Sequence, residues 1–127
     1  MKYFFEPINL SDWNIFKKVN TFSYQESFYG TKEMKIGDML FLYVTSGNKE
    51  ISSGIYGNGI IISEPDDNNS EQRIRVNVRI KYIRFDEPIL KYDICKQYIK
   101  QFRSVHRIDE TIMSGLMKTA LVNIIND

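Results

Sequence analysis

The chain has 127 residues, close to the commonest size of one folded domain, and this predicts a single domain over residues 1–127. Its 43% hydrophobic, 13% aromatic and 26% charged residues are typical of an ordered globule and exclude a disordered or fibrous chain. Seventeen Lys and Arg residues oppose sixteen Asp and Glu residues, so the formal charge of +1 excludes attraction to nucleic acid or membrane through overall charge.

Cysteine usage and hydropathy limit the compartment. Cys95 is the only cysteine, which excludes an internal disulfide and a Cys-based zinc site and suits a reducing environment. No apolar run approaches the roughly 18 residues of a membrane helix. The N-terminal segment reaches Glu6 and Pro7 too early for a signal peptide. We therefore expect a cytoplasmic protein without membrane contact.

The first elements are a short strand and a helix. Residues 2–6 are rich in rings and are followed by Pro7, which predicts a strand that ends there. Ser11 is a suitable N-cap for a helix that extends to about Asn20. Trp13 stands in this helix at helical spacing from other apolar residues. It is therefore either a core anchor or a ring at the helix start that overlooks a pocket.

The segment 21–30 places Phe22, Tyr24, Phe28 and Tyr29 among polar residues without a helical or strand period. Rings of this kind either fill a core from a loop or line a pocket, and periodicity does not decide between the two. A turn at residues 35–38, Lys-Ile-Gly-Asp, closes the segment. Residues 39–45 are apolar on both faces, as in a central strand of a barrel.

Two further strands follow. Residues 54–63 include three glycines within six positions, which indicates a sharp bend or a close approach of another backbone or a ligand. Residues 73–85 alternate between an apolar and a basic face. The basic face is either a solvated sheet surface or a set of phosphate contacts. Its members are Arg73, Arg75, Asn77, Arg79 and Lys81, and the apolar face holds Ile74, Val76, Val78, Ile80 and Tyr82.

The C-terminal third predicts two helices. The first starts near Asp93, with Ile94, Tyr98 and Phe102 at four-residue spacing on its apolar side. The second covers about residues 109–125, although Gly115 weakens it. A second positive patch comprises Lys96, Lys100, Arg103 and Arg107.

Catalytic groups are scarce. His106 is the single histidine, and no nucleophile motif or metal-ligand spacing accompanies it. The glycines of residues 54–59 lack the lysine and the following helix of a phosphate-binding loop. We therefore expect no enzyme activity, no metal and no cofactor, and we interpret the chain as a binding module.

The order of these motifs resembles the EVE domain, a member of the PUA-like superfamily that is related to YTH domains. The resemblance rests on Asn-Leu-Ser-Asp-Trp at 9–13, Lys-Ile-Gly-Asp at 35–38, Gly-Ile-Tyr-Gly-Asn-Gly-Ile-Ile-Ile-Ser-Glu-Pro at 54–65, Arg-Val-Asn-Val-Arg at 75–79 and Glu-Pro-Ile-Leu at 87–90. It implies an α+β fold in which a mostly antiparallel, partly closed β-barrel is flanked by helices.

The resemblance also implies a function. EVE domains resemble readers of modified nucleobases, namely N6-methyladenine or modified cytosines, that receive a flipped base in an aromatic pocket. They occur alone or fused to modification-dependent restriction enzymes, so a nuclease is an expected associate. The expected partner is modified DNA or RNA. The sequence departs from the family in having no tryptophan in the loop and Asp66 where relatives have an aromatic residue.

Carried over to this sequence, the resemblance implies stacking by Trp13, Phe22 and Tyr24, with Phe28 and Tyr29 in the core. Base-edge hydrogen bonds are expected from Asn9, Ser23 and Asn58. Phosphate contacts are expected from Arg73, Arg75, Arg79, Lys100, Arg103 and Arg107. An alternative function is a module that uses the same pocket for a nucleobase-like metabolite or for another protein.

Overall fold

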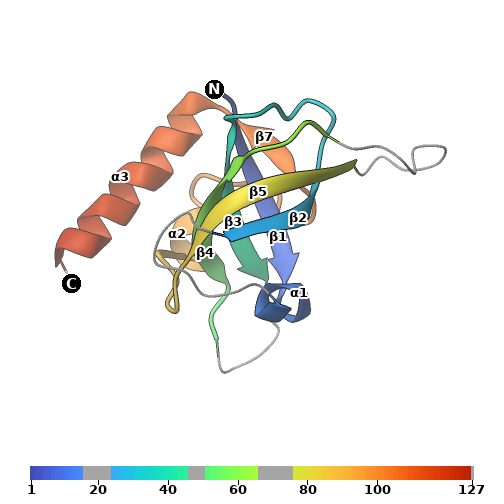
Figure 1. Ribbon diagram of the computed structural model, residues 1–127. Coiled ribbons are helices and arrows are strands. Elements are labelled where there is room, and N and C mark those ends of the chain that lie inside the picture. The colour runs from blue at the N-terminus through green and yellow to red at the C-terminus, as the bar shows by residue number, and fades with distance from the viewer. Residues whose placement is uncertain (16–23, 46–50, 66–75, 127) are drawn as a thin grey trace.

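The computed structural model describes residues 1–15, 24–45, 51–65 and 76–126 (Figure 1). Their elements, in chain order, are β1 (Tyr3–Asn9), α1 (Leu10–Ile15), β2 (Tyr24–Gly30), β3 (Met39–Thr45), β4 (Gly54–Ile61), β5 (Val76–Arg84), β6 (Leu90–Lys91), α2 (Tyr92–Cys95), β7 (His106–Ile108) and α3 (Glu110–Asn126).

The strands form one mixed sheet in the order β2-β5-β4-β3-β1-β7, and β6 pairs with β4 off this path. The pair of β1 and β3 is parallel, and the other strand pairs are antiparallel. Among the described residues, no pairing joins β2 to β7, so the barrel is only partly closed. The expected α+β fold with a mostly antiparallel, partly closed barrel and flanking helices is confirmed.

The sheet curls strongly around one hydrophobic cluster. Phe4 of β1 and Tyr82 of β5 belong to the same buried cluster although β3 and β4 stand between their strands. We call this set the inner cluster, and α1 closes it with Trp13. Its members are Phe4, Ile8, Trp13, Met34, Leu40, Leu42, Val44, Tyr56, Ile61, Val78, Ile80 and Tyr82.

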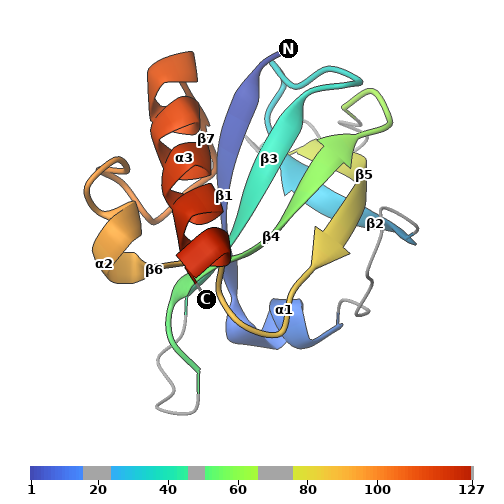
Figure 2. The ribbon, with the colours of Figure 1, turned by 90° about the vertical axis from the view of Figure 1, so that its left-hand side faces the viewer.

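A second cluster, the outer cluster, lies on the other face of the sheet. Figures 1 and 2 show α3 on this side, away from the curl formed by β2 and β5. The outer cluster contains Phe5, Phe41, Tyr43, Ile55, Leu90, Cys95, Ile99, Ile108 and Leu116. Alternation along β3 supplies both clusters, because Leu40 and Leu42 face inward while Phe41 and Tyr43 face outward. This explains why residues 39–45 are apolar on both faces.

The glycines of β4 permit its change of partner. β4 pairs with β5 over Gly57–Ile61 and with β6 over Gly54–Ile55. A Cβ atom on Gly57 would collide with the carbonyl oxygen of Ile83, and one on Gly54 with that of Leu90. A register shift between Leu42 and Tyr43 places a bulge in the same part of β4. The glycines therefore serve a close approach of backbones and a bend, which were the two features predicted from them.

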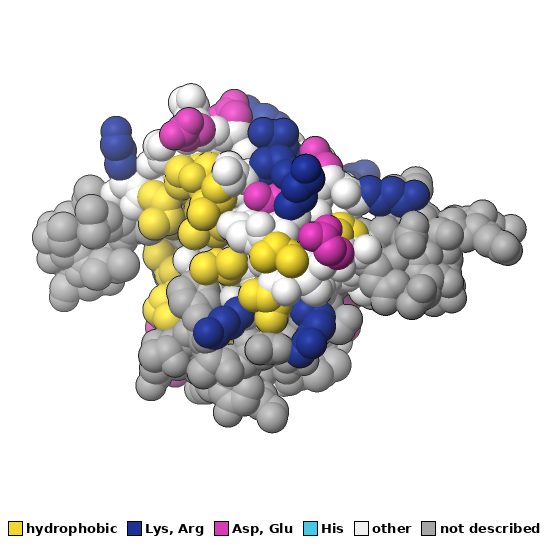
Figure 3. Space-filling view, turned by 45° about the horizontal axis from the view of Figure 1, so that its top comes forward, with side chains coloured by type: hydrophobic (Ala, Val, Ile, Leu, Met, Phe, Trp, Pro, Cys, Tyr) yellow, Lys and Arg dark blue, Asp and Glu magenta, His cyan; other side chains and the backbone are white. Residues whose placement is uncertain are grey.

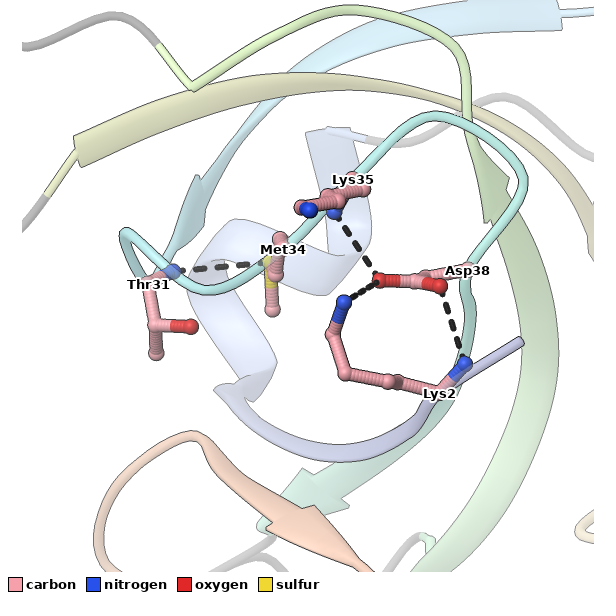
Figure 4. A network of polar contacts seen from close by, with 5 residues as sticks. All are labelled: Lys2, Thr31, Met34, Lys35 and Asp38. Atoms are coloured by element: carbon pink, nitrogen blue, oxygen red, sulfur yellow. Dashed lines mark hydrogen bonds and ion pairs between the residues drawn. The ribbon is translucent and has the colours of Figure 1, made fainter.

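The turn before β3 is fixed by Asp38, which is 4% exposed. Its Oδ1 accepts a hydrogen bond from the Lys2 backbone N–H at 2.9 Å, and its Oδ2 accepts one from Lys35 N–H at 2.9 Å (Figure 4). The Lys2 ammonium lies 3.0 Å from the same Oδ2. Gly37 has φ 93°, a conformation that glycine adopts without strain. The Lys-Ile-Gly-Asp sequence thus fastens the turn to the N-terminus of β1.

Two predictions about the N-terminal elements are wrong in detail. Pro7 does not end the first strand, because β1 continues to Asn9 in register with β3. β7 pairs only with Tyr3–Phe5, so the missing N–H of Pro7 lies beyond that pairing. The N-cap of α1 is Asn9 and not Ser11, since Asn9 Oδ1 accepts the Asp12 N–H at 2.8 Å. Residues 16–20 of the expected helix lie outside the described residues.

The C-terminal helices differ in how well they were predicted. α3 matches the expected helix, and Asp109 Oδ1 caps it by accepting the Ile112 N–H at 2.8 Å. The helix expected from Asp93 is only the four residues of α2, because the chain continues in turns such as Tyr98 N–H to Cys95 O at 3.0 Å. Tyr98 and Phe102 still pack against the outer cluster, so their apolar spacing is explained without a helix.

Candidate functional site

Trp13 closes the inner cluster at the end of β1, where α1 begins. Its side chain is only 2% exposed. Of the two interpretations of Trp13, this supports a core anchor rather than a ring at the open rim of a pocket. The Tyr56 ring lies near it, with centroids 6.2 Å apart and planes at 57°. The Tyr56 hydroxyl donates to the carbonyl oxygen of Ser52 at 2.6 Å, and this bond holds the ring in place. Two rings from α1 and β4 therefore meet at this end of the curled sheet.

Arg84, the last residue of β5, covers the Trp13 ring. Its guanidinium carbon lies 4.5 Å from the ring centroid, within the range of a cation–π contact. Its Nη1 also donates to the Trp13 carbonyl oxygen at 2.8 Å. Arg84 is half-buried, and this burial lowers the pKa of its guanidinium below the ordinary value. The group still carries its charge at neutral pH.

Two charged residues lie in one row of paired strand positions on the inner face. Glu6 of β1 is in register with Leu42, Leu42 with Gly57, and Gly57 with Arg84. Glu6 is 3% exposed and lies on the same face of β1 as the inner-cluster residues Phe4 and Ile8. The row thus places Glu6, in the middle of β1, and Arg84, at the end of β5, on the same face of the sheet as Trp13. Such groups can accept and donate hydrogen bonds at the edge of a planar ligand.

The predicted base-binding residues are only partly brought together. Phe22 and Ser23 lie outside the described residues. The backbone of Tyr24 pairs with Tyr82, two residues before Arg84. Asn9 is exposed at the start of α1, with its Oδ1 used as the helix cap.

Asn58 lies on the other face of the sheet from Trp13. It is in register with the outer-cluster residue Phe41, whereas Trp13 belongs to the inner cluster. Its Oδ1 is buried and has no hydrogen-bond partner within the described part of the chain. The structure therefore does not join Asn58 to Trp13 in one site.

The basic residues form two separate groups. Arg79 and Lys81 are exposed on β5, and Val78 and Ile80 between them are buried, as the alternation predicted. Arg73 and Arg75 lie outside the described residues. Lys100, Arg103 and Arg107 are exposed in and before β7. Three strands, β4, β3 and β1, separate β5 from β7 along the sheet.

The described surface at the N-terminal end of β1 has mixed charge. Figure 3 shows Lys and Arg side chains interspersed with Asp and Glu, together with apolar side chains. A field of one sign is therefore not formed on this face, in agreement with the net charge of +1.

Arg84, Glu6 and Tyr56 were not singled out from the sequence, although two of them had a signal. The alternation that places Val78, Ile80 and Tyr82 on the packed face continues to Arg84. A strand read through Pro7 would likewise place Glu6 between Phe4 and Ile8 on one face. A charged residue at a strand position that the alternation assigns to the packed face is uncommon, and it indicates a functional role or an interaction with another polar group.

The remaining reactive groups show no catalytic arrangement in the parts of the chain that the structure describes. Cys95 is fully buried, and burial raises the pKa of its thiol to about 12, so it is not a nucleophilic thiolate. His106 Nδ1 lies 3.0 Å from the carbonyl oxygen of Ser104. Within the described ranges, no cluster of His, Cys, Asp or Glu could hold a metal ion. No described helix is long and apolar enough to cross a membrane.

The sequence matches no protein-family model and no curated protein. Its fold, however, is shared by solved structures. Protein Rpa0253 from Rhodopseudomonas palustris aligns with a TM-score of 0.66 at 19% identity, over 96% of this chain and 94% of that one. Protein PSPTO5229 from Pseudomonas syringae aligns with a TM-score of 0.68 at 15% identity, over 93% of this chain and 99% of that one.

A third similar structure is human THYN1 in complex with DNA that contains 5-methylcytosine. It aligns with a TM-score of 0.65 at 10% identity, over 94% of this chain and 98% of that one. The similarity therefore covers nearly the whole of both chains.

Proposed function

Since this chain has the EVE-domain fold predicted from its motifs, we propose that it is a non-enzymatic module that reads a modified nucleobase in nucleic acid. Modified cytosine in DNA is the first ligand we propose. N6-methyladenine and RNA are the other ligands of the same class. A cytoplasmic location and association with a modification-dependent nuclease belong to this proposal.

The observation that supports it best is the shared fold with THYN1, whose structure contains 5-methylcytosine DNA, over 94% of this chain. The end of the barrel at Trp13 fits such a ligand chemically. Trp13 and Tyr56 provide rings for stacking, which contributes about 1 to 3 kcal/mol per base. This gain offsets the few kcal/mol that extrusion of a base from a duplex costs.

The edge of a base requires donors and acceptors in addition to rings. Glu6 lies on the inner face, in the row of strand positions that also contains Arg84. A carboxylate accepts hydrogen bonds from the exocyclic amine of cytosine, so Glu6 is the acceptor that we propose for the base edge. A carboxylate has room for several hydrogen bonds, so this role is compatible with the other interactions that Glu6 makes.

Binding to a panel of otherwise identical duplexes tests the proposal. Each duplex carries one unmodified cytosine, 5-methylcytosine, adenine or N6-methyladenine at the same position. We expect one modified duplex to bind at least about tenfold more tightly than its unmodified partner, which corresponds to about 1.4 kcal/mol. Equal affinity for all four duplexes would exclude a modified-base reader.

Salt dependence separates the alternative function. A nucleic-acid ligand loses affinity steeply as salt rises, because phosphate neutralisation releases counterions. An uncharged nucleobase-like metabolite should show nearly constant affinity between 50 and 200 mM salt, a range in which roughly 10³-fold losses occur for extensive phosphate contacts. Salt-independent binding of the free base would therefore replace the reader by a metabolite-binding module.

A further inference from the structure

The side chain that covers Trp13 stands where a stacked base would stand. The Arg84 guanidinium is planar, charged and 4.5 Å from the centroid of the Trp13 ring. Guanidinium groups and nucleobases use the same aromatic faces for stacking. Only one of them can occupy this side of the ring at a time.

We propose that Arg84 controls access to the base-binding site, because it shields the Trp13 ring in the free protein and is displaced by the incoming base. This inference rests on the proposed function and adds a mechanism to it. The displaced guanidinium then takes up a phosphate of the nucleic acid. Binding of the base and contact with the phosphate are thereby coupled through one side chain.

The burial of the neighbouring side chains supports Arg84 as the group that moves. Trp13 is only 2% exposed, so a base reaches its ring only if a neighbour leaves. Tyr56 is 3% exposed and bonded to Ser52, and the other inner-cluster residues are packed in the curl of the sheet. Arg84 is half-buried and is the last residue of its strand. A rotamer change of this side chain therefore does not require a change in the backbone pairing of the residues that precede it in β5.

The contacts of Arg84 with Trp13 are also of the kind that a ligand can replace. One is a cation–π contact and the other a single hydrogen bond to the Trp13 carbonyl oxygen. Water can satisfy the carbonyl oxygen when the guanidinium leaves.

The test compares wild-type protein with Arg84→Ala, using 5-methyl-2′-deoxycytidine and a duplex with one 5-methylcytosine as probes. Because the nucleoside has no phosphate, removal of the competing side chain should raise its affinity about 3- to 30-fold. For the duplex, the slope of log affinity against log salt should become less steep by about one phosphate contact. Arg84→Lys should retain the slope and give an intermediate nucleoside affinity, since an ammonium lacks the planar surface.

Trp13 is the only tryptophan, so its fluorescence reports the shielding directly. Quenching by acrylamide should be stronger in Arg84→Ala than in the wild type without any ligand. Lys81→Ala is the matched control, because Lys81 is exposed on the opposite face of the same strand. It should change neither the nucleoside affinity nor the quenching.

The outcomes distinguish the two proposals. If the wild type discriminates modified from unmodified duplexes but Arg84→Ala leaves nucleoside affinity unchanged or lowers it, the role of Arg84 is overturned while the reader survives. If Trp13 remains as shielded in Arg84→Ala as in the wild type, the covering role is overturned without reference to any ligand. If the wild type binds neither these probes nor any modified duplex of the four-duplex panel in preference to its unmodified partner, both proposals fail.

Discussion

The two ends of β1 are closed by charged side chains in different ways. At the N-terminal end, the Asp38 carboxylate accepts hydrogen bonds from the backbone N–H groups of Lys2 and Lys35. It also forms an ion pair with the Lys2 ammonium. At the other end, Arg84 covers Trp13 through one hydrogen bond and one ring contact. Asp38 accepts hydrogen bonds from two backbone N–H groups, whereas Arg84 covers an aromatic face that a base could also cover.

This difference indicates that the Asp38 end stabilises the fold and that the Arg84 end serves the proposed binding function. Removal of Asp38 would take the acceptor away from two partly buried N–H groups, which is costly wherever water cannot replace it. Removal of Arg84 would leave an aromatic face, which a ligand can cover. We therefore expect substitutions at the Asp38 end to act on stability and substitutions at the Arg84 end to act on binding.

The largest effect is expected from Trp13→Ala. Because Trp13 is 2% exposed in the inner cluster, truncation should lower the free energy of unfolding by about 3 to 5 kcal/mol. Urea denaturation measures this loss. Because alanine would act on stability, Trp13→Phe, which retains an aromatic ring, is the better probe of stacking. A loss below about 1 kcal/mol would mean that Trp13 is not a core residue in solution.

Asp38→Ala should be the next most destabilising change, by about 2 to 4 kcal/mol, because it removes the acceptor of two backbone N–H groups and the partner of Lys2. The affinity of the remaining folded protein for its ligand should be unchanged. Asp38→Asn retains acceptor capacity on one oxygen and should lose less stability. If Asp38→Ala instead lowers the affinity for the ligand and leaves the free energy of unfolding unchanged, Asp38 belongs to the binding site.

Arg84→Ala should cost less stability, about 0.5 to 2 kcal/mol, since a half-buried cation–π contact and one hydrogen bond are lost. Arg79→Ala, on the exposed face of the same strand, is the control and should change stability by less than about 0.5 kcal/mol. Thermal or urea unfolding of both variants measures the difference. If Arg84→Ala lowers the free energy of unfolding as much as Asp38→Ala does, both residues serve mainly to stabilise the fold.

Acid sensitivity should also distinguish the ends. Burial by itself raises the pKa of the Asp38 carboxyl, but the hydrogen bonds from Lys2 and Lys35 and the Lys2 ammonium outweigh it, so the pKa lies below its ordinary value of 3.8. A depressed folded-state pKa stabilises the protein above the unfolded value and loses that contribution as pH falls through the folded value. Unfolding between pH 5 and roughly pH 2 should therefore be less pH-dependent in Asp38→Asn than in the wild type.

Sequence patterns correctly predicted the elements that are determined by their own residues. β3 was predicted from Met39 to Thr45 as observed, and the alternation around Arg79 and Lys81 gave the correct faces. α3 was predicted because its apolar residues recur at helical spacing over 17 residues. The turn at Asp38 was also predicted, although its ion pair with Lys2 was not, since 36 positions separate the two residues.

The errors arose where tertiary pairing overrides a local signal. Pro7 is a common strand terminator, but pairing with β3 carries β1 past it. Tyr98 and Phe102 have helical spacing, yet they pack on the outer cluster from turns. The contact of Arg84 with Trp13 joins residues 71 positions apart, which no local pattern contains. Family resemblance suggested Trp13 for the site but not the side chain that covers it.

The most direct test of the account is the Trp13 indole N–H signal, which is the only indole signal in the nuclear magnetic resonance spectrum because the chain has one tryptophan. Titration with a duplex that carries one 5-methylcytosine should shift this signal together with that of the Arg84 side chain, and the unmodified duplex should shift neither at the same concentration. If the modified duplex binds while both signals remain unchanged and shifts appear instead around Lys100, Arg103 and Arg107, the Trp13 end is not the base-binding site.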